Sequence, residues 1–92
     1  MIQIVSLSKG QVIPKHEIQR IVNSARGTFN YAKFNLANGI YITITYNRDL
    51  TISVSTNTRD QQFYYEMLSL QRIYTQMRVV EFLFRWINKL NK

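Results

Sequence analysis

Apolar and polar residues alternate along three consecutive segments in the middle of the chain, and this alternation predicts three β-strands. The segments are residues 29–36, 40–46 and 50–56, and in each one the apolar members would share one face of a sheet. A further apolar segment, residues 2–7, predicts a first strand whose place in the sheet order the pattern does not determine. We therefore expect an antiparallel sheet of three to four strands.

The first loop of this sheet follows from the requirement that apolar residues face the same side. A two-residue turn at Asn38-Gly39 would put the apolar residues of strands 29–36 and 40–46 on opposite faces. A three-residue loop that begins at Ala37, with Gly39 left-handed, instead sets Phe34 opposite Ile42. We therefore predict the three-residue loop.

The same reasoning applied to the second loop predicts Asn47-Arg48-Asp49, with Ile44 opposite Ile52. The outer face of the sheet then carries hydroxyl groups, two tyrosines and Lys33, without an acidic residue. Such a face is typical of the solvated side of an antiparallel sheet, and it is also compatible with a bound nucleic acid or protein.

Two segments with apolar residues at helical spacing flank the three strands. The first helix is expected over residues 14–26, because proline suits a first helical position and Gly27 suits a left-handed cap. The last helix is expected over residues 61–91, with Asp60 as its cap. The predicted fold is thus α+β, of order β-α-β-β-β-α, with both helices on one face of the sheet and one domain over residues 1–92.

The last helix would be about 45 Å long, roughly twice the ~20 Å length of a six-residue strand. One apolar stripe, from Phe63 to Met77, is expected to cover the sheet, and a second stripe begins after Gln76. Since such a helix extends past the sheet, we expect its second half to expose a partner interface, most simply a homodimer. The predicted interface residues are Val79, Phe82, Leu83, Trp86 and Leu90.

The net charge of the chain indicates a binding function. Twelve Lys and Arg residues stand against five acids, which gives a net charge of +7 and favours an anionic partner such as a nucleic acid or an acidic protein surface. The leading hypothesis is a non-enzymatic module that binds nucleic acid or a nucleoprotein through a basic helix face. The candidate nucleic-acid-binding residues are Lys15, Arg20, Arg26, Lys33, Arg78, Arg85, Lys89 and Lys92.

Residues that carry catalysis are sparse, so we expect no enzyme, no metal and no cofactor. The chain has one histidine, His16, no cysteine and five scattered carboxylates. The helix, strand and helix outline is similar to small ribonuclease toxins of toxin–antitoxin systems, and this likeness implies Arg48, Arg59 and Tyr64 as residues to test. The outline is also similar to double-stranded RNA-binding domains, although Asp60-Gln61-Gln62-Phe63 stands where their lysine-rich helix start would be.

An alternative function is a phage, viral or mobile-element protein that binds and inhibits a host protein, for example a defence nuclease. Small size and a surface rich in Tyr, Phe and Trp motivate this hypothesis. No apolar run reaches the ~18 residues of a membrane span, and no signal peptide is visible. We therefore expect a cytoplasmic protein, in the host cytoplasm if the protein is viral.

Overall fold

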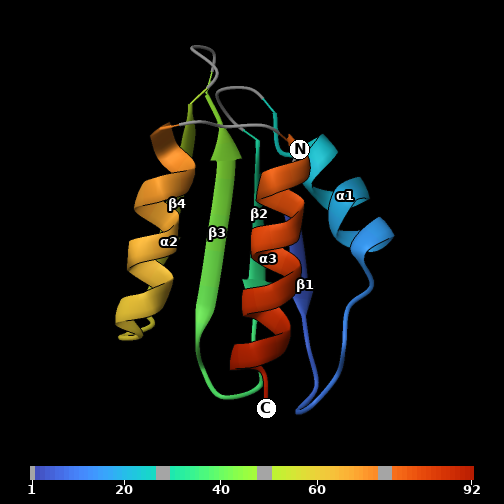
Figure 1. Ribbon diagram of the computed structural model, residues 1–92. Coiled ribbons are helices and arrows are strands. Elements are labelled where there is room, and N and C mark those ends of the chain that lie inside the picture. The colour runs from blue at the N-terminus through green and yellow to red at the C-terminus, as the bar shows by residue number, and fades with distance from the viewer. Residues whose placement is uncertain (1, 27–29, 48–50, 73–75) are drawn as a thin grey trace.

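The computed structural model describes residues 2–26, 30–47, 51–72 and 76–92, and these residues form a small α+β fold in two layers. One layer is a four-stranded sheet, and the other consists of three helices on one face of that sheet (Figure 1). In chain order the elements are β1 (Ile2–Ser6), α1 (Lys15–Ser24), β2 (Tyr31–Asn35), β3 (Tyr41–Tyr46), β4 (Ile52–Thr56), α2 (Gln61–Arg72) and α3 (Gln76–Leu90).

The sheet is mixed, with the strand order β1-β2-β3-β4. The strands β2, β3 and β4 are antiparallel to their neighbours, as expected, but β1 pairs with β2 in parallel. The prediction of an antiparallel sheet is therefore wrong for β1. The physical reason is the helix α1 between β1 and β2, which returns the chain to the end of the sheet from which β1 started.

The register of the first hairpin is as predicted. Phe34 lies opposite Ile42, and the backbone N–H of Leu36 donates to the carbonyl of Ile40 at 2.8 Å. Gly39 has a φ of 86°, the left-handed conformation that a three-residue loop requires and that glycine adopts without strain.

The register of the second hairpin differs from the prediction by two residues. Ile44 lies opposite Val54 rather than Ile52, and Tyr46 lies opposite Ile52. The backbone N–H of Asn47 donates to the carbonyl of Thr51 at 2.9 Å, so the loop is longer than expected. Alternation determines register only to within two residues, because a shift of two keeps the same side chains on the same face. The predicted loop residues 48 and 49 lie outside the described residues.

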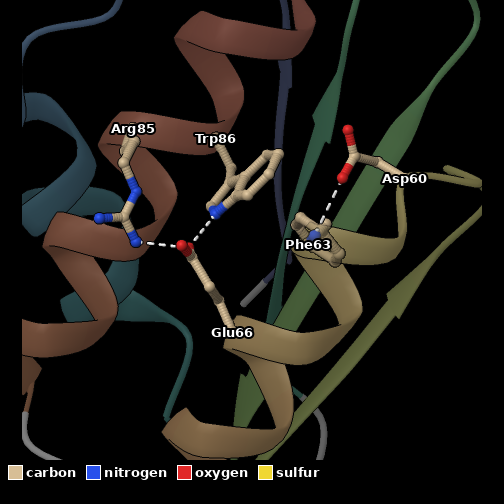
Figure 2. Close-up of polar contacts among 5 residues, drawn as sticks. All are labelled: Asp60, Phe63, Glu66, Arg85 and Trp86. Carbon is tan, nitrogen blue, oxygen red and sulfur yellow. Dashed lines mark hydrogen bonds and ion pairs between the residues drawn. The ribbon is translucent and has the colours of Figure 1, made fainter.

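The predicted single helix over residues 61–91 is instead two helices. Figure 1 shows α2 and α3 running in opposite directions side by side. The ring of Phe63 in α2 lies 5.1 Å from that of Phe82 and 5.6 Å from that of Trp86 in α3. A straight helix would separate these residues by about 30 Å, so the chain reverses after Arg72. The cap prediction is confirmed: a carboxylate oxygen of Asp60 accepts from the backbone N–H of Phe63 at 3.1 Å (Figure 2).

The reversal changes which side of the last helix is buried. The stripe predicted as a partner interface lies in the core, because α3 packs centrally between α1, α2 and the sheet. Val79, Leu83 and Trp86 are buried, whereas Met77, which was expected to cover the sheet, is 58% exposed. The expectation of an overhanging apolar end is therefore wrong: a helix of half the predicted length fits the sheet.

Two asparagines fix the end of α3 to the loops at the same end of the sheet. The Asn88 carboxamide bonds both backbone groups of Ile13, accepting from the N–H at 3.1 Å. The Asn91 side chain accepts from the N–H of Ala37 at 2.9 Å and donates to the carbonyls of Ser8 and Gln11. One side chain thus joins the β1–α1 segment, the first hairpin and the end of the last helix.

Candidate nucleic-acid interface

The helix α3 has two chemically different sides. Its buried side is apolar, and the opposite side is exposed and carries Arg78, Arg85 and Lys89. These residues are seven and four positions apart, so they lie on the same side of a helix with 3.6 residues per turn and span about 16 Å along it. The basic stripe expected from the sequence is therefore present, and it lies in the middle of the helical layer.

Two of the predicted cations that precede β2 contact α3. The Lys15 ammonium pairs with Glu81 of α3 at 2.7 Å, and Arg26 donates to the Gln76 side chain at 2.6 Å. Arg20 pairs within α1 with Glu17 at 2.8 Å and lowers the pKa of that carboxyl. Each of the three cations has an exposed side chain. Exposed pairs of this kind contribute little stability, and a phosphate can replace the carboxylate partner.

Two predicted site residues lie apart from the others. Lys33 stands on the outer face of the sheet, between buried Ala32 and Phe34, and its ammonium lies 5.1 Å from the ring of Tyr41. Lys92 follows α3 and lines a hollow of about 350 Å³ together with Lys9 of the β1–α1 segment. The structure therefore places five of the predicted cations on α1 and α3, Arg26 just after α1, Lys92 at the end of α3 and Lys33 on the opposite face of the sheet.

A carboxylate network joins α2 to the basic stripe, as Figure 2 shows. Glu66 of α2 accepts from the guanidinium of Arg85 and from the indole N–H of Trp86. Partial burial by itself raises the pKa of Glu66, but the hydrogen bond from Trp86 and the charge of Arg85 outweigh it, so the pKa lies below its usual value. The network holds Arg85 in place and satisfies the polar end of a buried tryptophan.

We expect the stability of the protein to fall below about pH 4.5, in part through Glu66. Because the folded pKa is lower than the unfolded value near 4.5, ionised Glu66 stabilises the fold above that pH, and the contribution is lost as the pH falls through the folded pKa. Glu66→Gln should lower the free energy of unfolding by about 1 kcal/mol at pH 7, and this free energy should then fall less steeply between pH 5 and pH 3 than in the wild-type protein. Urea unfolding of both proteins from pH 7 to pH 3 tests this. An equally steep fall of the free energy of unfolding at acid pH in both proteins would contradict it.

Sequence reasoning missed a groove between α2 and α3. Its volume is about 360 Å³, and its apolar lining includes Tyr65, Leu70, Met77 and Phe82. Tyr65 and Met77 are strongly exposed, as is Leu68 on the same helix as Tyr65. On these two helices, exposed apolar side chains thus lie at Tyr65 and Met77 of the groove rather than on residues 79–90. A change of apolar stripe after Gln76 was the only signal in the sequence, and it marks the helix reversal.

The residues singled out by the ribonuclease comparison do not form a described site. Arg48 lies outside the described residues, and Arg59 is exposed before α2. The Tyr64 hydroxyl donates to the carbonyl of Thr58 at 2.8 Å, a contact that fixes the start of α2. The expectation that the protein is not an enzyme stays a prediction.

Two negative findings apply to the part of the chain that the structure describes. Within it, no cluster of three histidine or acidic side chains could hold a metal ion. None of the helices described there combines the length and the apolarity needed to cross a bilayer.

Comparisons with protein-family models, with curated proteins and with solved structures found no match for this chain. The described residues form a mixed four-stranded sheet covered on one face by three helices. The basis for a functional proposal is therefore the chemistry of the residues on its surface.

Proposed function

We propose that the protein is a non-enzymatic nucleic-acid-binding module that contacts phosphates through the helical layer. The observation that carries the proposal is the stripe of Arg78, Arg85 and Lys89, with Lys15 of α1 beside it. The acids close to this surface, Glu66 and Glu81, each already hold a cation. A net charge of +7 draws a polyanion toward the surface over longer distances.

Binding of this kind depends steeply on salt and weakly on sequence, because phosphate contacts release counterions and carry no base information. Fluorescence anisotropy with labelled single-stranded and double-stranded oligonucleotides, from 25 to 200 mM salt, measures both properties. Absence of binding at micromolar protein concentration and low salt would overturn the proposal.

The double variant Arg78→Gln/Lys89→Gln is expected to weaken binding about tenfold near 150 mM salt and to reduce the salt slope by roughly 2. This choice leaves Arg85 in place, since its loss would disturb the Glu66 network. Lys9→Gln, which removes a charge from the end of the molecule, is the matched control and should change the affinity by less than about twofold. A loss of binding in Lys33→Gln, with the double variant unaffected, would place the interaction on the sheet face.

A second candidate function, binding to a protein, is favoured by the groove between α2 and α3. Tyr65 and Met77 expose apolar surface beside the arginines of the stripe, as in surfaces that bind an acidic amphipathic segment. In the hypothesis of an inhibitor from a phage, virus or mobile element, this groove would bind the host protein. Capture of a stoichiometric protein that survives nuclease treatment and is lost in Met77→Asp would favour this function.

A further inference from the structure

The strand β1 is an edge of the sheet, and no strand among the described residues pairs with its outer side. The sheet order begins with β1, and its one partner is β2. The backbone N–H of Leu7, just after the strand, donates to the carbonyl of Asn35 at 2.9 Å. Because backbone groups alternate sides along a strand, the N–H and C=O groups of Ile2, Ile4 and Ser6 point away from β2.

This edge also exposes apolar side chains. Ile2 is 52% exposed and Ile4 is 60% exposed, although both are large β-branched residues in a strand. Their register partners are Tyr31 and Lys33, so their side chains lie on the sheet face that the helices leave uncovered. The strand contains no proline and no charged residue, which are the features that usually protect an edge from pairing. Such an edge favours addition of another strand.

We propose that two copies of the protein associate through antiparallel pairing of β1 with β1 of the second copy, centred on Ile4. Of the possible registers, this one opposes Ile4 to its own copy and Ile2 to Ser6, so that all three outward-facing residues pair. Each opposed pair exchanges two backbone hydrogen bonds, because the groups of all three residues point to the free edge. The product is a closed two-fold dimer with one continuous sheet.

The distribution of charge favours a second copy as the occupant. Although the chain carries +7, β1 contributes no charge, so the opposed strands do not repel each other. The basic stripe lies on α3 in the middle of the helical layer, and in the view of Figure 1 the strand β1 appears between α3 and α1, so that α1 flanks the free edge. Because Lys15 faces α3, the side of α1 turned away from α3 carries the Arg20–Glu17 ion pair, which holds both signs of charge. Two copies that meet at this edge therefore oppose an uncharged strand, flanked by a helix side that carries both signs of charge, and keep their basic stripes apart.

Sedimentation velocity on nuclease-treated protein, from about 5 to about 500 µM, tests the inference. The contact is small, so we expect a concentration-dependent equilibrium between one chain and a species of twice its 11.0 kDa mass, with the midpoint on the order of 100 µM. A single chain at every concentration would overturn the proposal. Species larger than a dimer would also overturn it, because they indicate pairing of β1 with the opposite edge, β4, in an open array.

Two variants locate the contact. Ile4→Lys places like charges opposite each other at the centre of the pairing and should abolish the dimer over the whole range. Ile4→Thr keeps a β-branched side chain and the backbone groups, so it should still dimerise, at most about fivefold more weakly. Ser6→Lys, away from the two-fold axis, should weaken the dimer by about tenfold. Circular dichroism checks that each variant is folded. Equal dimerisation of folded Ile4→Lys and Ile4→Thr would refute pairing through β1.

Discussion

Replacing Trp86 by alanine is expected to lower the free energy of unfolding by about 3–5 kcal/mol, the usual cost of removing a buried aromatic side chain. The Trp86 side chain is 1% exposed and packs edge-on against the ring of Phe63, 5.6 Å away. Its indole N–H donates to Glu66, so truncation also removes one of the bonds that hold this carboxylate beside Arg85. In a domain of this size, such a loss is a large part of the total stability.

Urea unfolding followed by far-UV circular dichroism measures the effect, since Trp86 is the single tryptophan and its fluorescence disappears with it. Leu68→Ala is the matched control: Leu68 is 59% exposed on α2, so its truncation should change stability by less than about 0.5 kcal/mol. Trp86→Phe keeps a ring but loses the hydrogen bond, and an intermediate cost of about 2 kcal/mol is expected. An unchanged midpoint with an altered oligomeric state would instead support the sequence-based hypothesis that Trp86 contacts a partner.

The sheet shows which structural information the amino-acid pattern carries and which it lacks. Alternation assigned the buried faces of β2, β3 and β4 correctly, because each buried residue has polar neighbours. Gly39 and the face requirement together determined the first hairpin. The second hairpin has no such glycine, and two registers two residues apart satisfy the same pattern. The direction of β1 depends on how α1 crosses the sheet, which periodicity within β1 does not encode.

The last third of the chain was predicted less well because no glycine or proline marks the end of α2. The sequence from Arg72 to Gln76 reads as a continuous helix, and only the change in the position of the apolar stripe signals a reversal. That change was interpreted as extra exposed surface on one long helix. In the structure a second helix begins there, and a different side of it faces the sheet. Contacts between Phe63 and Trp86, residues far apart in sequence, decide between the two interpretations.

The candidate binding surface was predicted in part. Residues such as Arg78, Arg85 and Lys89 share a helix, so the helical period alone places them together. Their relation to Lys15 and Arg26 depends on the packing of α1 against α3, which the sequence did not specify. Lys33 was grouped with them by charge alone, and the strand alternation that puts it on the other face was already visible in the sequence.

Asn91→Ala is expected to lower the free energy of unfolding by about 3 kcal/mol, although the residue lies beyond the last helix. Its side chain is only 2% exposed, and it satisfies the N–H of Ala37 and the carbonyls of Ser8 and Gln11. Alanine leaves these backbone groups without their partner, and each unsatisfied buried group costs about 1–3 kcal/mol, reduced where water reaches it. No tertiary packing energy is needed for this estimate, because the loss is one of hydrogen bonds.

Asn38→Ala is the control for this prediction, since Asn38 is exposed, donates to the Leu90 carbonyl at 2.8 Å and accepts from the Ile40 N–H at 3.3 Å. Because water can replace these exposed bonds, their loss should cost about 0.5 kcal/mol. Asn91→Asp keeps an acceptor for Ala37 but presents a negative charge to two carbonyls, so it should be no better tolerated than alanine. Urea unfolding gives the global stability, and amide exchange at Ala37 reports the local contact. If the chain end is frayed, neither measurement changes. If Asn91 joins the three segments, amide exchange at Ala37 becomes faster and the free energy of unfolding falls.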